Sequence, residues 1–233
     1  MESKDRIIVA LDYATRAEAL AFVEMVGDKV GMYKVGLELF TSEGPDLVRE
    51  IIHLGGKVFL DLKFKDIPNT MAGAAKAAAK LGVYMFNVHA SAGIEGMIAA
   101  AKNKGDLKLL AVTVLTSFEE NNAHLVYGAP TKAKVLQFAR DAKLARCDGV
   151  VCSPQELKLL RKQQELECFV TVTPGIRAKN SLPDDQNRTM TAAEAYLAGA
   201  DYEVIGRPIT QAADPLLAIS QFAEQISNAA ISR

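Results

Sequence analysis

Short apolar runs alternate with longer stretches of helical periodicity along the whole chain. The runs are rich in β-branched residues and are apolar at consecutive positions, as expected for parallel strands that are buried on both faces. We predict eight strands, at 6–11, 32–36, 57–62, 85–90, 107–115, 149–152, 169–174 and 202–206. Strands that are each followed by a helical stretch are typical of repeated βαβ units.

The helical stretches carry recognisable start and stop signals. The stretch 15–26 opens with Thr15, and Glu18 follows three residues later, which is the spacing of a capping box. The stretch 69–82 is rich in alanine and closes with Gly82. Two further stretches, 131–145 and 214–226, have apolar positions at helical spacing.

Eight such units in 233 residues fit a closed (β/α)8 TIM barrel, a fold that usually takes about 250 residues. We predict one barrel domain over 1–233, because no Pro/Gly/Ser-rich linker divides the chain. A doubly wound sheet is the alternative, but it usually has fewer strands and a glycine-rich first turn. The segment ALDYAT (10–15) has no such glycines. A long polar segment at about 176–190 is predicted to be an active-site lid, since loops of that length are commonly functional.

Charge and composition exclude several classes of partner. Lysine plus arginine number 27 and aspartate plus glutamate 28, a net charge of −1, so we expect neither nucleic acid nor an anionic membrane surface as a partner. The N-terminal residues do not resemble a signal peptide, and no apolar stretch has the length of a membrane span. Cys147, Cys152 and Cys168 lack CxxC spacing, which predicts neither disulfides nor zinc. We therefore expect a cytoplasmic protein with reduced cysteines.

Polar residues gather where the predicted strands end, and (β/α)8 barrels carry their chemistry at that end. In chain order they are Asp12, Lys34, Asp61, Lys63, His89, Thr116, Ser117, TPGIR (173–177) and GRP (206–208). Some of them have an ordinary structural interpretation. Asp12 can cap a helix or form a turn, and His89 can be satisfied within the core.

The segment DLKFKD (61–66) is the most specific signal in the chain. Residues two apart on a strand face the same side, so Asp61 and Lys63 should project together into the barrel mouth, and Asp66 should arrive from the following loop. An ion-pair network built for stability alone is the alternative. However, ion pairs in a desolvated mouth stabilise less than apolar residues of equal volume would. Lys34, in an otherwise apolar strand, must likewise face an anion, because an unpaired buried charge is very costly.

Two glycine-containing segments predict a phosphate site. TPGIR follows the seventh strand and IGRP (205–208) follows the eighth, the positions at which barrels often bind phosphate. Gly175 and Gly206 permit close approach of the backbone to an anion. Arg207 adds a planar set of donors that suits phosphate oxygens.

Together these residues resemble the orotidine 5′-monophosphate decarboxylase family, in its bacterial type. The matching segments run almost from end to end: VALD, YKVGLELF, DLKFKDIPNT, NVHAS, VTVLTS, TPGIR with DDQNR, and VIGRPI. The resemblance implies decarboxylation of orotidine 5′-monophosphate to uridine 5′-monophosphate, the last step of de novo pyrimidine biosynthesis. It also implies that neither a metal nor an organic cofactor takes part.

The resemblance further implies a catalytic role for four charged residues. Lys63 would deliver a proton to C6 of the pyrimidine, and Asp61 would lie against the departing carboxylate. Lys34 and Asp66 would complete an alternating array, with Asp66 supplied by the partner subunit of a homodimer that shares its active sites.

Substrate binding is implied for the remaining residues. Asp12 and Lys34 would bind ribose hydroxyls, Thr116 the pyrimidine edge, and Ile67 and Thr70 would enter the shared site. The phosphate would be held by Arg177, Gln186, Gly206 and Arg207, with Gln186 also reaching the base.

Two alternatives stay open at this point. One is a Mg²⁺-dependent relative, a 3-keto-L-gulonate 6-phosphate decarboxylase or hexulose-phosphate synthase, for which Glu38 would be the additional acidic ligand. The other is a barrel that binds a nucleotide without catalysis. Binding alone does not need a buried lysine such as Lys63, which disfavours the second alternative.

Overall fold

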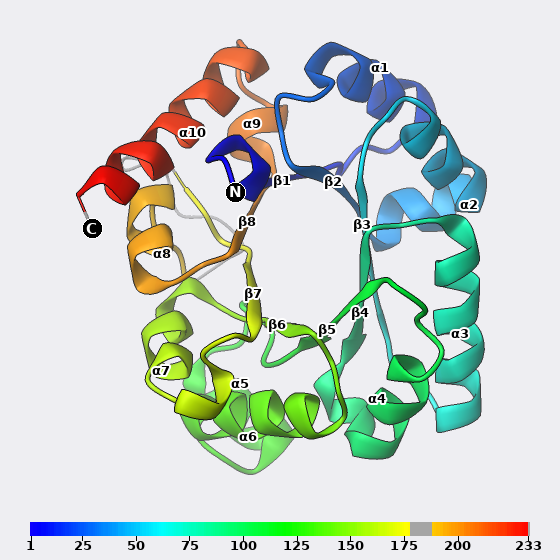
Figure 1. The fold of residues 1–233 in the computed structure, drawn as a ribbon, viewed down its shortest axis with the longest axis vertical. Coiled ribbons are helices and arrows are strands. Elements are labelled where there is room, and N and C mark those ends of the chain that lie inside the picture. Colours follow the sequence, from blue (N-terminus) through cyan, green and yellow to red (C-terminus); the bar gives the residue numbers. More distant parts are fainter. Residues whose placement is uncertain (178–187, 233) are drawn as a thin grey trace.

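The structure is a computed structural model that describes residues 1–177 and 188–232, and its strands close into a barrel (Figure 1). All eight strands are parallel and follow the order of the sequence, and β8 pairs with β1 to complete the ring. The strands are β1 (Ile7–Ala10), β2 (Met32–Val35), β3 (Val58–Phe64), β4 (Met85–His89), β5 (Lys108–Val112), β6 (Gly149–Val151), β7 (Val170–Thr173) and β8 (Tyr202–Ile205). The predicted (β/α)8 fold is confirmed. The largest difference lies in the predicted strand 107–115, of which only Lys108–Val112 forms strand.

Helices surround the barrel as an outer ring (Figure 1). The α-helices are α1 (Arg16–Val26), α2 (Leu37–His53), α3 (Pro68–Leu81), α4 (Gly93–Ala101), α5 (Glu120–Tyr127), α6 (Thr131–Leu144), α7 (Leu157–Arg161), α8 (Ala192–Ala198), α9 (Arg207–Thr210) and α10 (Pro215–Ile231). In the described part of the chain, the 3-10 helices are η1 (Lys4–Arg6), η2 (Ala90–Ala92), η3 (Pro154–Glu156) and η4 (Gln164–Leu166). The predicted N-cap at Thr15 and the predicted stop at Gly82 are confirmed, whereas the second hydrogen bond of a capping box, from the Thr15 N–H to Glu18, is not among those of α1. The Thr15 side chain accepts the Glu18 N–H at the start of α1, and Gly82 ends α3 in the left-handed conformation, with φ of 77°.

Within the described residues, no helix is both long enough and apolar enough to cross a membrane.

Alternation along the strands divides the core into two layers. Inside the barrel lie Ile8, Ala10, Met32, Phe59, Met85, Leu110, Val172, Tyr202 and Val204. The intervening strand residues face the helices and form the larger core. Two residues beyond Met32, Phe59 and Met85 stand Lys34, Asp61 and Asn87. The barrel interior therefore changes from apolar to polar toward the carboxyl ends of three neighbouring strands.

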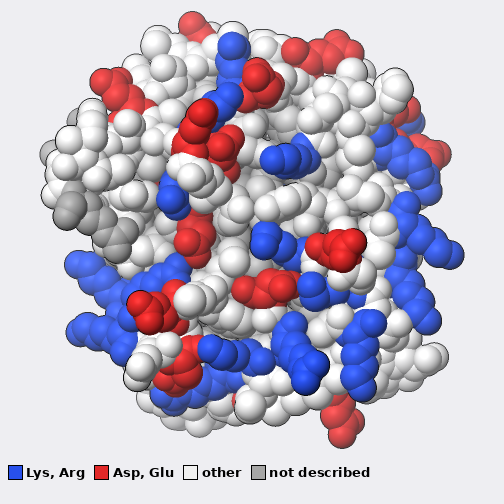
Figure 2. Space-filling view, viewed as in Figure 1, with Lys and Arg blue, Asp and Glu red and all other residues white. Residues whose placement is uncertain are grey.

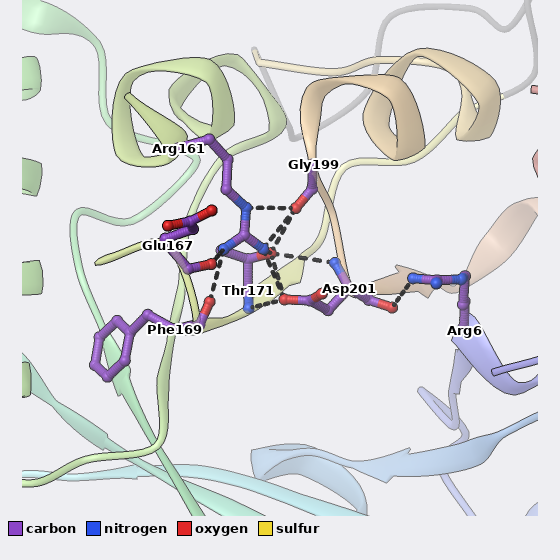
Figure 3. A network of polar contacts seen from close by, with 7 residues as sticks. All are labelled: Arg6, Arg161, Glu167, Phe169, Thr171, Gly199 and Asp201. Carbon is purple, nitrogen blue, oxygen red and sulfur yellow. Dashed lines mark hydrogen bonds and ion pairs between the residues drawn. The ribbon is translucent and has the colours of Figure 1, made fainter. Parts of the chain in front are cut away.

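The opposite end of the barrel is tied together by Arg161, beside the starts of β7 and β8 (Figure 3). Its Nη2 lies 2.7 Å from the Asp201 carboxylate and 2.7 Å from the Gly199 carbonyl, and its Nη1 donates to the Phe169 carbonyl at 2.9 Å. The same Asp201 carboxylate accepts the Thr171 N–H at 2.8 Å. One guanidinium thus joins α7, α8 and two strands far from the charged end, which keeps the last two strands in register.

Figure 2 views the face on which the strands begin, and acidic and basic side chains are interspersed over it. Basic side chains are most frequent in the lower half of this view, on the side of α4, α6 and α7 (Figures 1 and 2). This mixture agrees with the near-zero net charge.

One buried acid on β8 has no evident partner. Glu203 is 1% exposed, and neither of its carboxylate oxygens has a hydrogen-bond partner in the described structure. Its neighbours Tyr202 and Val204 face the barrel interior, so Glu203 points into the layer between sheet and helices. Burial raises the pKa of Glu203 to about 9, although Arg6 acts in the opposite direction. The side chain is therefore a neutral acid at pH 7.

This pKa predicts a pH-dependent stability that Glu203→Gln should remove. The folded chain holds the proton up to about pH 9, whereas the unfolded chain releases it near the ordinary glutamate pKa of 4.5, so stability falls as pH rises between these values. Glu203→Gln should therefore gain stability relative to wild type as pH increases from 5 to 8. Urea unfolding of both proteins at several pH values measures this difference. A difference in unfolding free energy that stays constant across the range would contradict the assignment.

Candidate active site

A cavity of about 240 Å³ opens where the strands end. The predicted site residues that line it are Asp12, Lys34, Asp61, Lys63, Thr116, Arg177, Gly206 and Arg207. Apolar atoms of Phe59, Val151 and Val204 form part of its wall. The structure thus brings most of the predicted residues of one chain into one space.

Charged side chains of alternating sign form a continuous row along the cavity. Lys63 Nζ lies 2.7 Å from Asp61 Oδ1, and Lys34 Nζ lies 3.6 Å from Asp61 Oδ2. Lys34 Nζ also donates to Asp12 Oδ1 at 3.1 Å. The side chains of Asp61 and Lys34 are only 13% and 11% exposed, so water screens these charges weakly. Ordered charges in such a place are ready to act on a substrate without rearrangement.

The row depends on an irregularity in β3. Leu60 pairs with Phe86 and Phe64 with Val88, so β3 takes four steps while β4 takes two. Within this bulge Lys63 has φ of 51°, a left-handed conformation that costs a non-glycine residue roughly 1–3 kcal/mol. Bulges near active sites commonly redirect a side chain. The regular alternation predicted for Asp61 and Lys63 therefore does not hold at Lys63, although both side chains still meet.

Two residues that support this row were missed by the sequence reasoning. Asn87 Oδ1 accepts the Lys63 N–H at 2.7 Å, and Asn87 Nδ2 donates to Asp61 Oδ1 at 2.6 Å. At Gly36, a Cβ would stand 2.8 Å from Lys34 Nζ, so a side chain there would displace that ammonium from its present position. Both positions lie within segments quoted for the resemblance, NVHAS and YKVGLELF, but spacing alone does not distinguish them from core residues.

Backbone conformation shapes the other side of the cavity, where phosphate was predicted. Gly175 has φ of 86°, which only glycine adopts without strain. Its carbonyl accepts the Met190 N–H, and the Arg177 N–H donates to the Met190 carbonyl at 3.0 Å, so 175–177 pair with Met190. Gly206 caps α9, and Arg207 is the first residue of that helix.

Arg188 is a further missed residue, and it connects three loops. It forms an ion pair with Glu156, whose side chain is 3% exposed, and its Nη2 donates to the Leu115 carbonyl at 2.9 Å. Burial raises the pKa of Glu156, and the Arg188 charge opposes that shift. Leu115 precedes Thr116, so this pair holds the loop that presents Thr116 to the cavity.

His89, at the end of β4, is neutral. Burial lowers its pKa to about 4, and the charges of Lys65 and Lys63 act in the same direction. The Ser91 N–H points at His89 Nδ1, 3.4 Å away, and the Ser91 hydroxyl lies at 2.8 Å. His89 therefore caps η2 and does not add a further cation to the row.

Some predicted residues are not brought into the cavity. Asp66, Ile67 and Thr70 are exposed and do not line it, and the Asp66 carboxylate accepts the N–H of Ile67. Gln186 lies outside the described residues, as does most of the predicted lid segment. Within the described ranges, no group of three His, Cys, Asp or Glu side chains could hold a metal ion.

The fold and this cavity define the class of protein: a (β/α)8 barrel with a row of paired lysines and aspartates at its mouth and arginines beside it. The model of the "Orotidine 5'-phosphate decarboxylase / HUMPS family" matches residues 5–222. This chain belongs to that family.

Relatives and solved structures agree with this membership. An orotidine 5'-phosphate decarboxylase of Vibrio cholerae serotype O1 is 50% identical over 224 residues, which cover 93% of this chain and 96% of the relative. One from Moorella thermoacetica is 47% identical, with 97% of this chain and 94% of the relative covered. The crystal structure of orotidine 5'-phosphate decarboxylase from Lactobacillus acidophilus matches with a TM-score of 0.82 and 37% identity, over 94% of this chain and 98% of that one.

Proposed function

We propose that this chain decarboxylates orotidine 5′-monophosphate to uridine 5′-monophosphate, the last step of de novo pyrimidine biosynthesis, in the cytoplasm. The observation that carries the proposal is the Lys63 ammonium, held 2.7 Å from Asp61 in a cavity that also contains Lys34 and Arg207. The similarity to decarboxylases over nearly the whole chain supports the same reaction.

Lys63 acts as the proton donor. The bond between C6 and the carboxylate breaks, its electron pair stays on C6, and carbon dioxide leaves. The pyrimidine has no electron sink of the kind that pyridoxal phosphate supplies. A fixed ammonium aimed at C6 stabilises the charge as it develops and then transfers its proton to that carbon. Asp61 holds the ammonium and lies against the departing carboxylate. No metal or organic cofactor enters this mechanism.

The rest of the cavity binds the substrate at a distance from the reacting bond. Asp12 and Lys34 bind ribose hydroxyls, and Thr116 binds the pyrimidine edge. Arg177, Gln186, Gly206 and Arg207 hold the phosphate. Binding energy from this remote group serves to orient the base against Lys63.

A homodimer completes each site in this proposal. Asp66, Ile67 and Thr70 lie outside their own chain's cavity and enter that of the partner, where Asp66 extends the alternating array. Ile67 is 67% exposed and Ile94 is 38% exposed, and both line one cleft between the start of α3 and α4. Apolar side chains in such a position favour a protein interface.

The Mg²⁺-dependent alternative is less well supported, because Glu38, its additional acidic ligand, is exposed and does not line the cavity.

Loss of orotidine 5′-monophosphate absorbance, measured with EDTA present, tests the proposed reaction. Wild type should turn over at an unchanged rate after chelation, whereas a Mg²⁺-dependent relative should lose its activity. Lys63→Ala is the matched control: kcat should fall by about 10²–10⁴-fold, because the proton donor is lost. Binding of uridine 5′-monophosphate by this variant should be largely retained. Near-normal turnover by Lys63→Ala would contradict the role of Lys63.

Mixing two inactive variants tests the shared site. In a hybrid of Asp66→Ala and Lys63→Ala chains, one of the two sites regains both residues. Equal mixing should restore roughly a quarter of the wild-type activity, since about half of the dimers are hybrids. Each variant mixed with itself is the control. A hybrid without activity, in a preparation shown by native mass spectrometry to contain it, would contradict a shared site.

A further inference from the structure

The backbone of Lys63 is held in an unfavourable conformation by one buried neighbour. Among the described residues, Lys63 and Arg146 are the two non-glycine residues with positive φ, at 51° and 63°. Arg146 follows the end of α6, where chains often turn through this conformation. Lys63 stands within a strand, where nothing in the local sequence requires it.

Asn87 is the residue that holds Lys63 in this conformation. It is fully buried on β4, and its neighbours Phe86 and Val88 belong to the outer core layer, so its side chain faces the barrel interior. Its amide oxygen accepts the Lys63 N–H at 2.7 Å, a donor that regular pairing with β4 no longer satisfies inside the bulge. Its amide nitrogen donates to Asp61 Oδ1 at 2.6 Å.

These two hydrogen bonds require an amide at position 87. Asp61 Oδ1 accepts from Asn87 Nδ2 and, at 2.7 Å, from Lys63 Nζ. Asn87 therefore controls the proton donor twice, through the backbone from which the lysine extends and through the carboxylate that receives its ammonium. An aspartate at this position would keep the shape but would lose the donor and place a second carboxylate beside Asp61.

We infer that Asn87 is a positioning residue that aims the Lys63 ammonium. This inference rests on the proposed function. It does not line the cavity and so acts through Lys63 and Asp61, not through the substrate. The strain at Lys63 is maintained because two short hydrogen bonds to one buried side chain oppose its relaxation.

Steady-state kinetics of Asn87→Ala test this role. We expect kcat to fall by about 10²-fold, because a small misplacement of a catalytic group has that effect, while KM changes much less. Titration with uridine 5′-monophosphate gives the fraction of intact sites and corrects kcat for unfolded protein. Arg146→Gly, at the other residue with positive φ, is the matched control and should leave kcat unchanged. An unchanged kcat for Asn87→Ala, or a loss that equals the loss of intact sites, would overturn the inference.

The isosteric variant Asn87→Asp provides a second kinetic readout. Two adjacent carboxylates share a proton at low pH, so kcat of this variant should rise as pH falls below neutrality, relative to wild type. A kcat ratio of variant to wild type that is independent of pH would count against the contact with Asp61.

Thermal melting tests the strain without any need for activity. Lys63→Gly should melt a few degrees above Lys63→Ala, because only glycine adopts positive φ without strain. In the Asn87→Ala background this difference should disappear, since residue 63 can then relax. If wild type does not turn over orotidine 5′-monophosphate, the proposed function fails, and the melting comparison still decides whether Asn87 holds the backbone. If the difference in melting temperature between Lys63→Gly and Lys63→Ala is the same with and without Asn87→Ala, the inference that Asn87 holds this backbone is overturned.

Discussion

The carboxylate of Asp61 is the group on which the geometry of the cavity depends. Lys63 Nζ, Lys34 Nζ and Asn87 Nδ2 all approach it, at 2.7, 3.6 and 2.6 Å. These partners come from three neighbouring strands, so one buried anion fixes the relative positions of β2, β3 and β4 at their carboxyl ends. Because the Asp61 side chain is only 13% exposed, removal of one of these partners would leave a poorly solvated polar group unpaired, which is costly.

The barrel makes this arrangement possible by separating stability from chemistry. The interior of the barrel is apolar below the charged mouth, toward the starts of the strands. Arg161 ties the starts of β7 and β8 together at this end, opposite the cavity (Figure 3). The mouth can then hold charges and a strained residue that add little to stability. Lys63, at φ of 51°, and the bulge in β3 are the strained parts of the mouth. The conformational free energy that this strain costs is spent at the position where the reaction needs a fixed ammonium.

Periodicity in the sequence predicted the fold because burial of parallel strands is a local signal. The eight strands, the cap at Thr15 and the stop at Gly82 could all be read from neighbouring residues. The residues that support the cavity could not be predicted in this way. Asn87 sits in an apolar run and has the pattern of a core residue, and its partner Lys63 is 24 residues away. Arg188 finds Glu156 across 32 residues. The bulge that turns Lys63 arises from pairing between strands, which depends on register and not on local sequence.

The most direct test of this account is a crystal structure with uridine 5′-monophosphate bound. The account predicts that Lys63 Nζ remains paired with Asp61 and stands about 3–3.5 Å from C6 of the pyrimidine, within reach for proton transfer. The phosphate should lie against Arg207 and Gly206. A bound nucleotide with the Lys63 ammonium directed toward solvent and away from the ring would contradict the central claim.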